Sequence, residues 1–151
     1  MEKDIRCGEG DCKDPYSYTG FLIWVMGNIL SQSIEGAAAN KDNLPFNHFM
    51  VLASLFWLSC SEKKVNQRRL ATYMHMREIT VSTIMKKLEK KGYVSVDVDE
   101  DDKRSKLLSV TEYGTTTFMG MIEDVVRRER RIDSPGLQKK LASLLKSVSN
   151  R

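Results

Sequence analysis

The amino-acid sequence predicts a mainly α-helical fold that carries one small β-hairpin. Most of the chain has apolar residues at spacings of three and four, which is the period of an α-helix. Residues 93–98 instead alternate strictly between apolar and other side chains, as a half-buried β-strand does. Gly92, directly before them, stands where a helix commonly ends in a left-handed residue. The change of period at this glycine predicts that a helix gives way to a hairpin.

The N-terminal part predicts a flexible arm followed by one long helix. Residues 1–15 are polar and contain two glycines and a proline. From about residue 16 to residue 39, apolar residues recur at the spacing of one helix face, and Trp24 widens that face. The face comprises Leu22, Val25, Met26 and Ile29. Because a helix that is apolar nearly all round needs several partners, we expect residues 16–43 to form a dimerisation helix.

Three further helices are predicted before the hairpin. Pro45 suits the first turn of a helix that continues to Cys60 and is apolar enough to be central and buried. After the polar connection 61–65, residues 67–74 and 77–91 predict two short helices. A pair of short helices followed by a small hairpin is a winged helix-turn-helix.

The hairpin is predicted to lead into the C-terminal helices. Residues 106–111 are short and apolar enough to be the antiparallel partner of 93–98. Thr111 followed by Glu112 is typical of a helix N-cap with an acid in the first turn. The helix that follows ends in the basic run 127–131, and its inward face comprises Phe118, Ile122 and Val125.

The last helix is predicted to open at Ser134-Pro135 and to carry a continuous apolar stripe. The stripe comprises Leu137, Leu141, Leu144, Leu145 and Val148. One winged unit offers too little surface to cover this stripe and the Trp24 face together. We therefore expect residues 115–151 to form C-terminal dimerisation helices; the alternative is that these faces pack within one chain.

Composition and cysteine content exclude several classes of protein. The chain has 151 residues and a net charge of +4, and its longest apolar stretch, residues 49–60, is too short to cross a bilayer. No leader-like segment opens the sequence, so we expect a cytoplasmic protein that does not bind membranes. Cys7, Cys12 and Cys60 are sparse, and reduced thiols without a metal or cofactor are the simplest expectation. Neither a nucleophile–base pair nor a glycine-rich phosphate loop is present, so we expect no enzyme.

The second short helix has a composition that suits DNA. Residues 62–91 hold nine basic and three acidic side chains, so they carry more net positive charge than the whole chain. On a helical wheel, Val81, Ile84, Met85 and Leu88 share one face, which must face the core. The opposite face carries Ile79, Ser82, Thr83, Lys86, Lys87 and Lys90. Hydroxyl and ammonium groups can reach base edges and phosphates, whereas a merely solvated face does not explain the projecting Ile79.

Residues 88–114 resemble the signature of the multiple-antibiotic-resistance-regulator (MarR) family. The matching landmarks are Leu88-Glu-Lys-Lys-Gly92, an acidic turn closing on Asp102-Lys-Arg104, and Thr111-Glu-Tyr-Gly114. Upstream, 49–55, Leu70-Ala71 and 80–83 stand where that family places its helices. The resemblance implies a homodimeric, sequence-specific transcriptional regulator, a repressor of its targets, with the winged helix-turn-helix over residues 44–114 and double-stranded DNA as its partner.

The resemblance also implies roles for the tip of the hairpin. Arg104 would enter the minor groove, and Asp102 would hold the tip and its arginine in shape. The remaining acids, residues 99–101, would point away from the duplex. Glu100 stands where the family commonly has proline, which predicts a looser turn, and Arg77 stands at the helix start without a capping side chain. The expected DNA-binding residues are Arg68, Arg69, Arg77, Ile79, Thr80, Ser82, Thr83, Lys86, Lys87, Asp102, Lys103 and Arg104.

The signal to which such a regulator responds stays open. Members of the family often bind small aromatic effectors between the dimerisation helices and the winged unit. Here Phe46, His48, Phe49 and Trp57 could line such a cleft, although core packing also accounts for them. Redox sensing by the cysteines is an alternative, and non-specific, architectural DNA binding is another.

Overall fold

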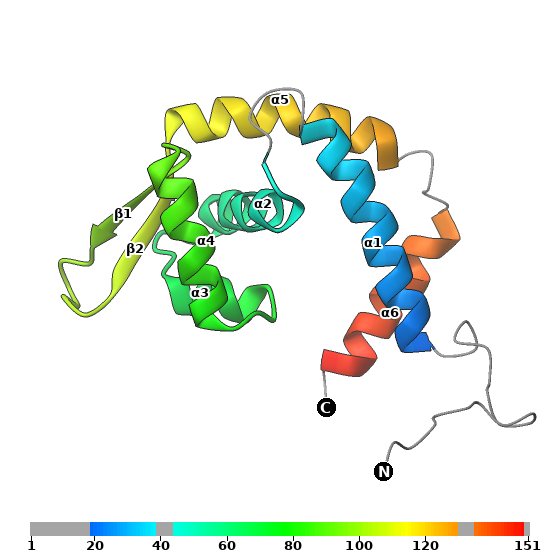
Figure 1. The fold of residues 1–151 in the computed structure, drawn as a ribbon. Coiled ribbons are helices and arrows are strands. Elements are labelled where there is room, and N and C mark those ends of the chain that lie inside the picture. Colours follow the sequence, from blue (N-terminus) through cyan, green and yellow to red (C-terminus); the bar gives the residue numbers. More distant parts are fainter. Residues whose placement is uncertain (1–18, 39–43, 130–134, 150–151) are drawn as a thin grey trace, which may run out of the picture.

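The computed structural model describes residues 19–38, 44–129 and 135–149, which form six helices and one antiparallel pair of strands (Figure 1). In chain order the elements are α1 Thr19–Ala38, α2 Phe46–Ser61, α3 Gln67–Tyr73, α4 Glu78–Lys90, β1 Val94–Val98, β2 Lys106–Val110, α5 Glu112–Glu129 and α6 Pro135–Ser149. The predicted order of elements is confirmed. Residues 39–43, the end of the predicted dimerisation segment 16–43, lie outside the described residues, and the other predicted helix and strand boundaries are shifted by three residues or fewer. The arm at 1–15, Cys7 and Cys12 lie outside the described residues. None of the described helices is long and apolar enough to cross a membrane.

The hydrophobic core lies inside the winged unit, around α2. Val51, Leu52 and Leu55 of this helix are fully buried. The predicted inward face of α4 is confirmed, since Val81 and Leu88 are fully buried against the same core. Each such side chain contributes about 1.5–3 kcal/mol relative to an exposed position. This core holds α4 by one face and leaves its opposite face in solvent.

The hairpin is attached to the rest of the winged unit along one edge. Val96 pairs with Leu108 in the register of β1 and β2. The N–H of Leu108 donates to the carbonyl of Val65 at 2.8 Å, and Asn66 forms an isolated bridge with Leu107. The segment before α3 is therefore attached to the middle of β2 by one bridge and one hydrogen bond, which hold the hairpin against the winged unit.

Two glycines shape the ends of the hairpin. Gly92 has a φ of 78°, as predicted for the residue after α4, and the N–H of Tyr93 donates to the carbonyl of Leu88 at 3.0 Å. Gly114 lies so close to Tyr93 that an added Cβ would stand 2.0 Å from the carbonyl oxygen of Tyr93.

The Thr111 hydroxyl donates to the carbonyl of Gly92 at 2.6 Å and accepts from the N–H of Gly114 at 2.9 Å. Thr111 is therefore the predicted cap of α5, and it also joins the end of α4 to the start of α5.

Helices α1 and α6 lie on one side of the winged unit, and α5 reaches across to them (Figure 1). Helix α1 also contacts the start of α2, where the N–H of Phe46 donates to the carboxylate of Glu35 at 3.3 Å. Some apolar residues of α1 and α6 are exposed: Trp24 is 63% exposed and Leu145 is 66% exposed. This exposure is what a dimerisation surface requires, and the role of the two helices stays a prediction. Leu137 and Val148 of the predicted stripe lie outside the residues whose side chains are described.

Candidate nucleic-acid interface

The outer face of α4 is open to solvent along its length. Ile79, at the start of the helix, is 75% exposed, and Thr83 and Lys86 are exposed on the same face. The Thr83 hydroxyl donates to the carbonyl of Ile79 at 2.8 Å, which orders this part of the face. Arg77 occupies the N-cap position without a side-chain cap, as expected, and its side chain is exposed. This face combines an apolar tip with hydroxyl and ammonium groups, the set that can contact base edges.

A groove of about 590 Å³ separates α4 from the hairpin. Ser82 and Lys86 line it from α4, Arg68 from α3, and Asp102 and Arg104 from the hairpin tip. The other lining residues are Asn66, Gln67, Glu78, Met85, Glu89, Val96, Ser105 and Lys106. Five of the predicted DNA-binding residues thus meet in one groove, although they come from three separate segments of the chain.

The hairpin tip is closed by main-chain contacts around Asp102. Its carboxylate accepts a hydrogen bond from the N–H of Arg104 at 3.0 Å, and its carbonyl accepts from the N–H of Ser105 at 2.7 Å. The N–H of Asp99 donates to the carbonyl of Ser105 at 3.0 Å and closes the turn on the other side. These hydrogen bonds close the turn at Glu100; the looser turn expected from the missing proline stays a prediction. Arg104 itself extends into solvent.

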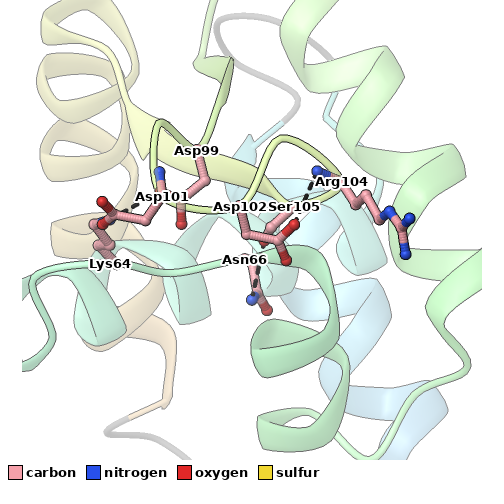
Figure 2. A network of polar contacts seen from close by, with 7 residues as sticks. All are labelled: Lys64, Asn66, Asp99, Asp101, Asp102, Arg104 and Ser105. Carbon is pink, nitrogen blue, oxygen red and sulfur yellow. Dashed lines mark hydrogen bonds and ion pairs between the residues drawn. The ribbon is translucent and has the colours of Figure 1, made fainter.

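Lys64 joins the acidic part of the hairpin to the segment before α3 (Figure 2). Its ammonium group donates to the carboxylate of Asp99 at 2.8 Å and also pairs with Asp101. The hydrogen bond from Lys64 lowers the pKa of Asp99, so the ion pair persists at neutral pH and is lost only as the pH falls through that lowered value. In Figure 2 these acids lie on one side of the tip, and the Arg104 side chain extends to the other. The ion pairs with Lys64 hold Asp99 and Asp101 on this side of the tip, and the expectation that the acids point away from a bound duplex stays a prediction.

Replacing Lys64 with alanine should loosen the hairpin without unfolding the protein. The variant loses both ion pairs, whereas the Val65–Leu108 hydrogen bond stays in place. Faster amide hydrogen exchange across residues 99–105 is therefore expected, together with a smaller loss of DNA affinity than removal of Arg104 produces. Lys63→Ala is the matched control, because Lys63 is an exposed neighbour with no ion pair among the described residues. Equal exchange rates in the two variants would show that Lys64 does not hold the tip.

The remaining predicted DNA-binding residues occupy different surroundings. Thr80 and Lys103 are exposed. Arg69 is hydrogen-bonded within the protein: its Nε donates to both carboxylate oxygens of Glu62 at 2.9 and 3.0 Å. These hydrogen bonds raise the pKa of Arg69. Lys87 lines a separate cavity and not the groove beside the hairpin. The structure thus does not bring Arg69 and Lys87 together with the other members of the predicted set.

The four candidate effector-binding residues occupy different surroundings within the described part of the chain. Phe49 is 2% exposed and packs against Phe118 with ring centroids 5.8 Å apart, so it belongs to the core. Phe46 is partly buried against the same core, and Trp57 is 58% exposed. His48 lines the cavity that contains Lys87. The core interpretation, which the sequence left open, therefore accounts for the two phenylalanines.

Sequence reasoning missed Lys64, Asn66 and Ser105. The Asn66 amide donates to the Ser105 hydroxyl at 3.4 Å, and its side-chain oxygen caps α3 by accepting from the N–H of Arg69 at 2.8 Å. An asparagine directly before a helix is a recognisable cap signal, which could have identified Asn66. No local signal marks Lys64, since its partners lie more than thirty residues away in the chain.

Comparison with known proteins finds a matching family model and a similar transcriptional regulator. The family model described as "MarR family" matches residues 49–106. The chain is 32% identical over 114 residues to the HTH-type transcriptional regulator YdcH of Bacillus subtilis, which covers 74% of this chain and 77% of that protein.

Solved structures share the fold at lower sequence identity. The CouR protein of Rhodococcus jostii RHA1 bound to p-coumaroyl-CoA superimposes with a TM-score of 0.74 at 23% identity, covering 91% of this chain and 95% of CouR. The S. aureus MepR–DNA complex gives a TM-score of 0.72 at 18% identity, covering 89% and 98% of the two chains.

Proposed function

The chain belongs to the MarR family of transcriptional regulators, and from this premise we propose that two copies bind one pseudo-palindromic DNA operator and repress the adjacent genes. The observation that carries the proposal is the groove between α4 and the hairpin, with Arg104 at its outer end. In this arrangement α4 enters the major groove and Arg104 enters the neighbouring minor groove.

The groove lies where the DNA strand that separates those two DNA grooves would pass. Among the described residues, its basic side chains, Arg68, Lys86, Arg104 and Lys106, outnumber its acids, Glu78, Glu89 and Asp102, by one. Arg68 pairs with Glu78 at 3.9 Å, while Asp99 and Asp101 are held by Lys64. The basic side chains can pair with phosphates. Ile79 and Thr83 lie on the outer face of α4, where a thymine methyl group and base-edge atoms are within reach. Phosphate contacts thus position the protein, and the outer face of α4 selects the sequence.

The proposed dimer rests on exposed apolar side chains of α1 and α6. Ile23 and Trp24 of α1 are 54% and 63% exposed, and Leu144 and Leu145 of α6 are 45% and 66% exposed. A second copy that covers both helices removes this surface from water. Two-fold symmetry then presents two α4 helices to successive turns of the major groove, about 34 Å apart.

A small effector is the proposed signal that releases the DNA. Support comes from CouR, whose structure contains p-coumaroyl-CoA, an aromatic acyl thioester. Within the described residues, Phe46, Phe49 and Trp57 do not enclose a space for an aromatic ring. The proposed aromatic effector therefore requires surfaces beyond these three side chains, such as those that a second copy brings.

Selection of bound duplexes from a random DNA pool tests the proposed function. We expect recovered sequences with two related half-sites whose centres lie about 10 base pairs apart, and A·T-rich positions beside them. The mass of the free protein in solution should be twice that of one chain. Uniform affinity for every sequence, changing only with salt, would instead indicate a non-specific DNA-coating protein.

A further inference from the structure

An acidic side chain, Glu78, stands at the start of α4 and lines the groove beside the hairpin. Its side chain is 63% exposed, and it shares the groove flank of α4 with Ser82, four residues later. A carboxylate in this place repels the phosphates that approach the groove. Its position in a DNA-binding surface therefore needs an explanation, and none of the DNA contacts proposed above uses it.

Contacts among the described residues leave the carboxylate of Glu78 able to accept hydrogen bonds. Its ion-pair partner, the Arg68 Nε, lies 3.9 Å from the Glu78 Oε1, which is too long for a hydrogen bond. The Arg69–Glu62 pair differs, since its hydrogen bonds are 2.9 and 3.0 Å long. Within the described part of the chain, no N–H or hydroxyl group donates to Glu78. Arg68 therefore offsets part of the negative charge without occupying the carboxylate oxygens.

The other interpretation of Glu78 is purely structural. An acid in the first turn of a helix interacts favourably with the N-terminal end of the helix dipole, and Glu78 holds that place in α4. Glu112 holds the same place in α5, outside the groove. The dipole accounts for an acid at the start of either helix, but it does not require that acid to face the groove. Glu112 is therefore the matched control for Glu78.

The edges of the DNA bases offer a partner that suits a carboxylate. A carboxylate only accepts hydrogen bonds, and the N4 amino group of cytosine donates one in the major groove. The N6 amino group of adenine also donates, but the N7 acceptor beside it repels a second carboxylate oxygen. In helix-turn-helix proteins, the N-terminal residues of the recognition helix contact base edges. Glu78 is the first residue of α4, directly before the exposed Ile79, so it occupies the end of the helix that makes such contacts.

We propose that Glu78 selects a C·G base pair in each half-site by accepting a hydrogen bond from the N4 amino group of cytosine. The proposal rests on the proposed function, since it requires α4 to enter the major groove. Where cytosine is present, the carboxylate regains a hydrogen bond for the water that it loses. Where cytosine is absent, the carboxylate loses water without a new donor, which disfavours other sequences at this position.

Operator duplexes that lack one amino group test the proposal. Each cytosine of the selected operator is replaced in turn by a pyrimidinone nucleotide, which is deoxycytidine without its N4 amino group, and affinity is measured by fluorescence anisotropy. At one position in each half-site, the unaltered protein should lose affinity about tenfold. Glu78→Ala should lose this tenfold difference, and any effect of the weaker base pair itself persists in that variant. Glu112→Ala should keep the tenfold difference.

Glu78→Gln gives a second readout, which does not depend on the folding of the alanine variant. A glutamine side chain pairs with N6 and N7 of adenine, so the preferred base at that position should change from cytosine to adenine. A purely structural role of Glu78 in α4 would not change a base preference.

An unchanged base preference in both Glu78 variants overturns the inference, while the selected operator still supports the proposed function. A uniform rise in the affinity of Glu78→Ala for all duplexes, without a change in preference, also overturns it, because Glu78 would then only repel the DNA backbone. If the unaltered protein selects no operator, the proposed function fails and this inference fails with it.

Discussion

Replacing Arg104 with alanine should weaken operator binding by about 1–3 kcal/mol, a loss of roughly 5- to 150-fold. Arg104 extends from a tip that is closed by Asp102 and held by Lys64. The hairpin tip therefore loses little conformational entropy when Arg104 enters the minor groove. The loss should be greatest for operators with A·T-rich flanks, where the minor groove is narrow and most negative. Fluorescence anisotropy with operators that differ only in those flanks measures it.

The matched control for this variant is Arg127→Ala. Arg127 is an exposed arginine of α5 that pairs with Asp124 at 3.4 Å and lies outside the proposed interface. Its removal subtracts the same charge, so any general effect of net charge on DNA binding appears in both variants. Equal affinities for the two variants, at every flank composition, would rule out a contact between Arg104 and the minor groove.

Gly114→Ala should destabilise the winged unit by about 3 kcal/mol or more, because overpacking is costly when the neighbours cannot move. The new Cβ would stand 2.0 Å from the carbonyl oxygen of Tyr93 and 3.0 Å from a methyl group of Val110. One neighbour is main chain and the other lies at the end of β2, so neither can withdraw as the tip of a flexible side chain does. Urea unfolding followed by circular dichroism measures the change in unfolding free energy.

Gly20→Ala is the control for that experiment. An added Cβ at Gly20 meets no atom within 4 Å, and the residue lies in the first turn of α1. Alanine also favours the helical backbone, so this variant should be as stable as the unaltered protein or slightly more stable. Matching urea midpoints for the two alanine variants would mean that the joint at Gly114 tolerates a side chain.

The order of the helices and the hairpin could be predicted because the signals for it are local. The inward face of α4 follows from the spacing of Val81 and Leu88, and its end follows from Gly92. The exposure of Ile79 follows from the same spacing, since a residue opposite a buried face must face solvent. These inferences need only the geometry of one helix.

The contacts that distinguish one basic residue from another could not be predicted. Arg68 and Arg69 are neighbours of the same type, yet Arg68 lines the groove and lies 3.9 Å from Glu78, while Arg69 forms close hydrogen bonds with Glu62 outside the groove. Lys64 looked like one more charge in a basic segment, and its role depends on where the chain returns thirty-five residues later, at Asp99. Such long-range pairs are set by the folded arrangement and leave no periodic trace in the sequence.

The hydroxyl of Thr111 has a mechanical consequence. Because it touches both Gly92, which follows the end of α4, and the first turn of α5, a twist of the long helix relative to α4 strains two hydrogen bonds, of 2.6 and 2.9 Å. We therefore expect the winged unit to rotate as one body when the far end of α5 changes its tilt. Because α5 is long, a small change of tilt at one end should displace the other end by a larger distance.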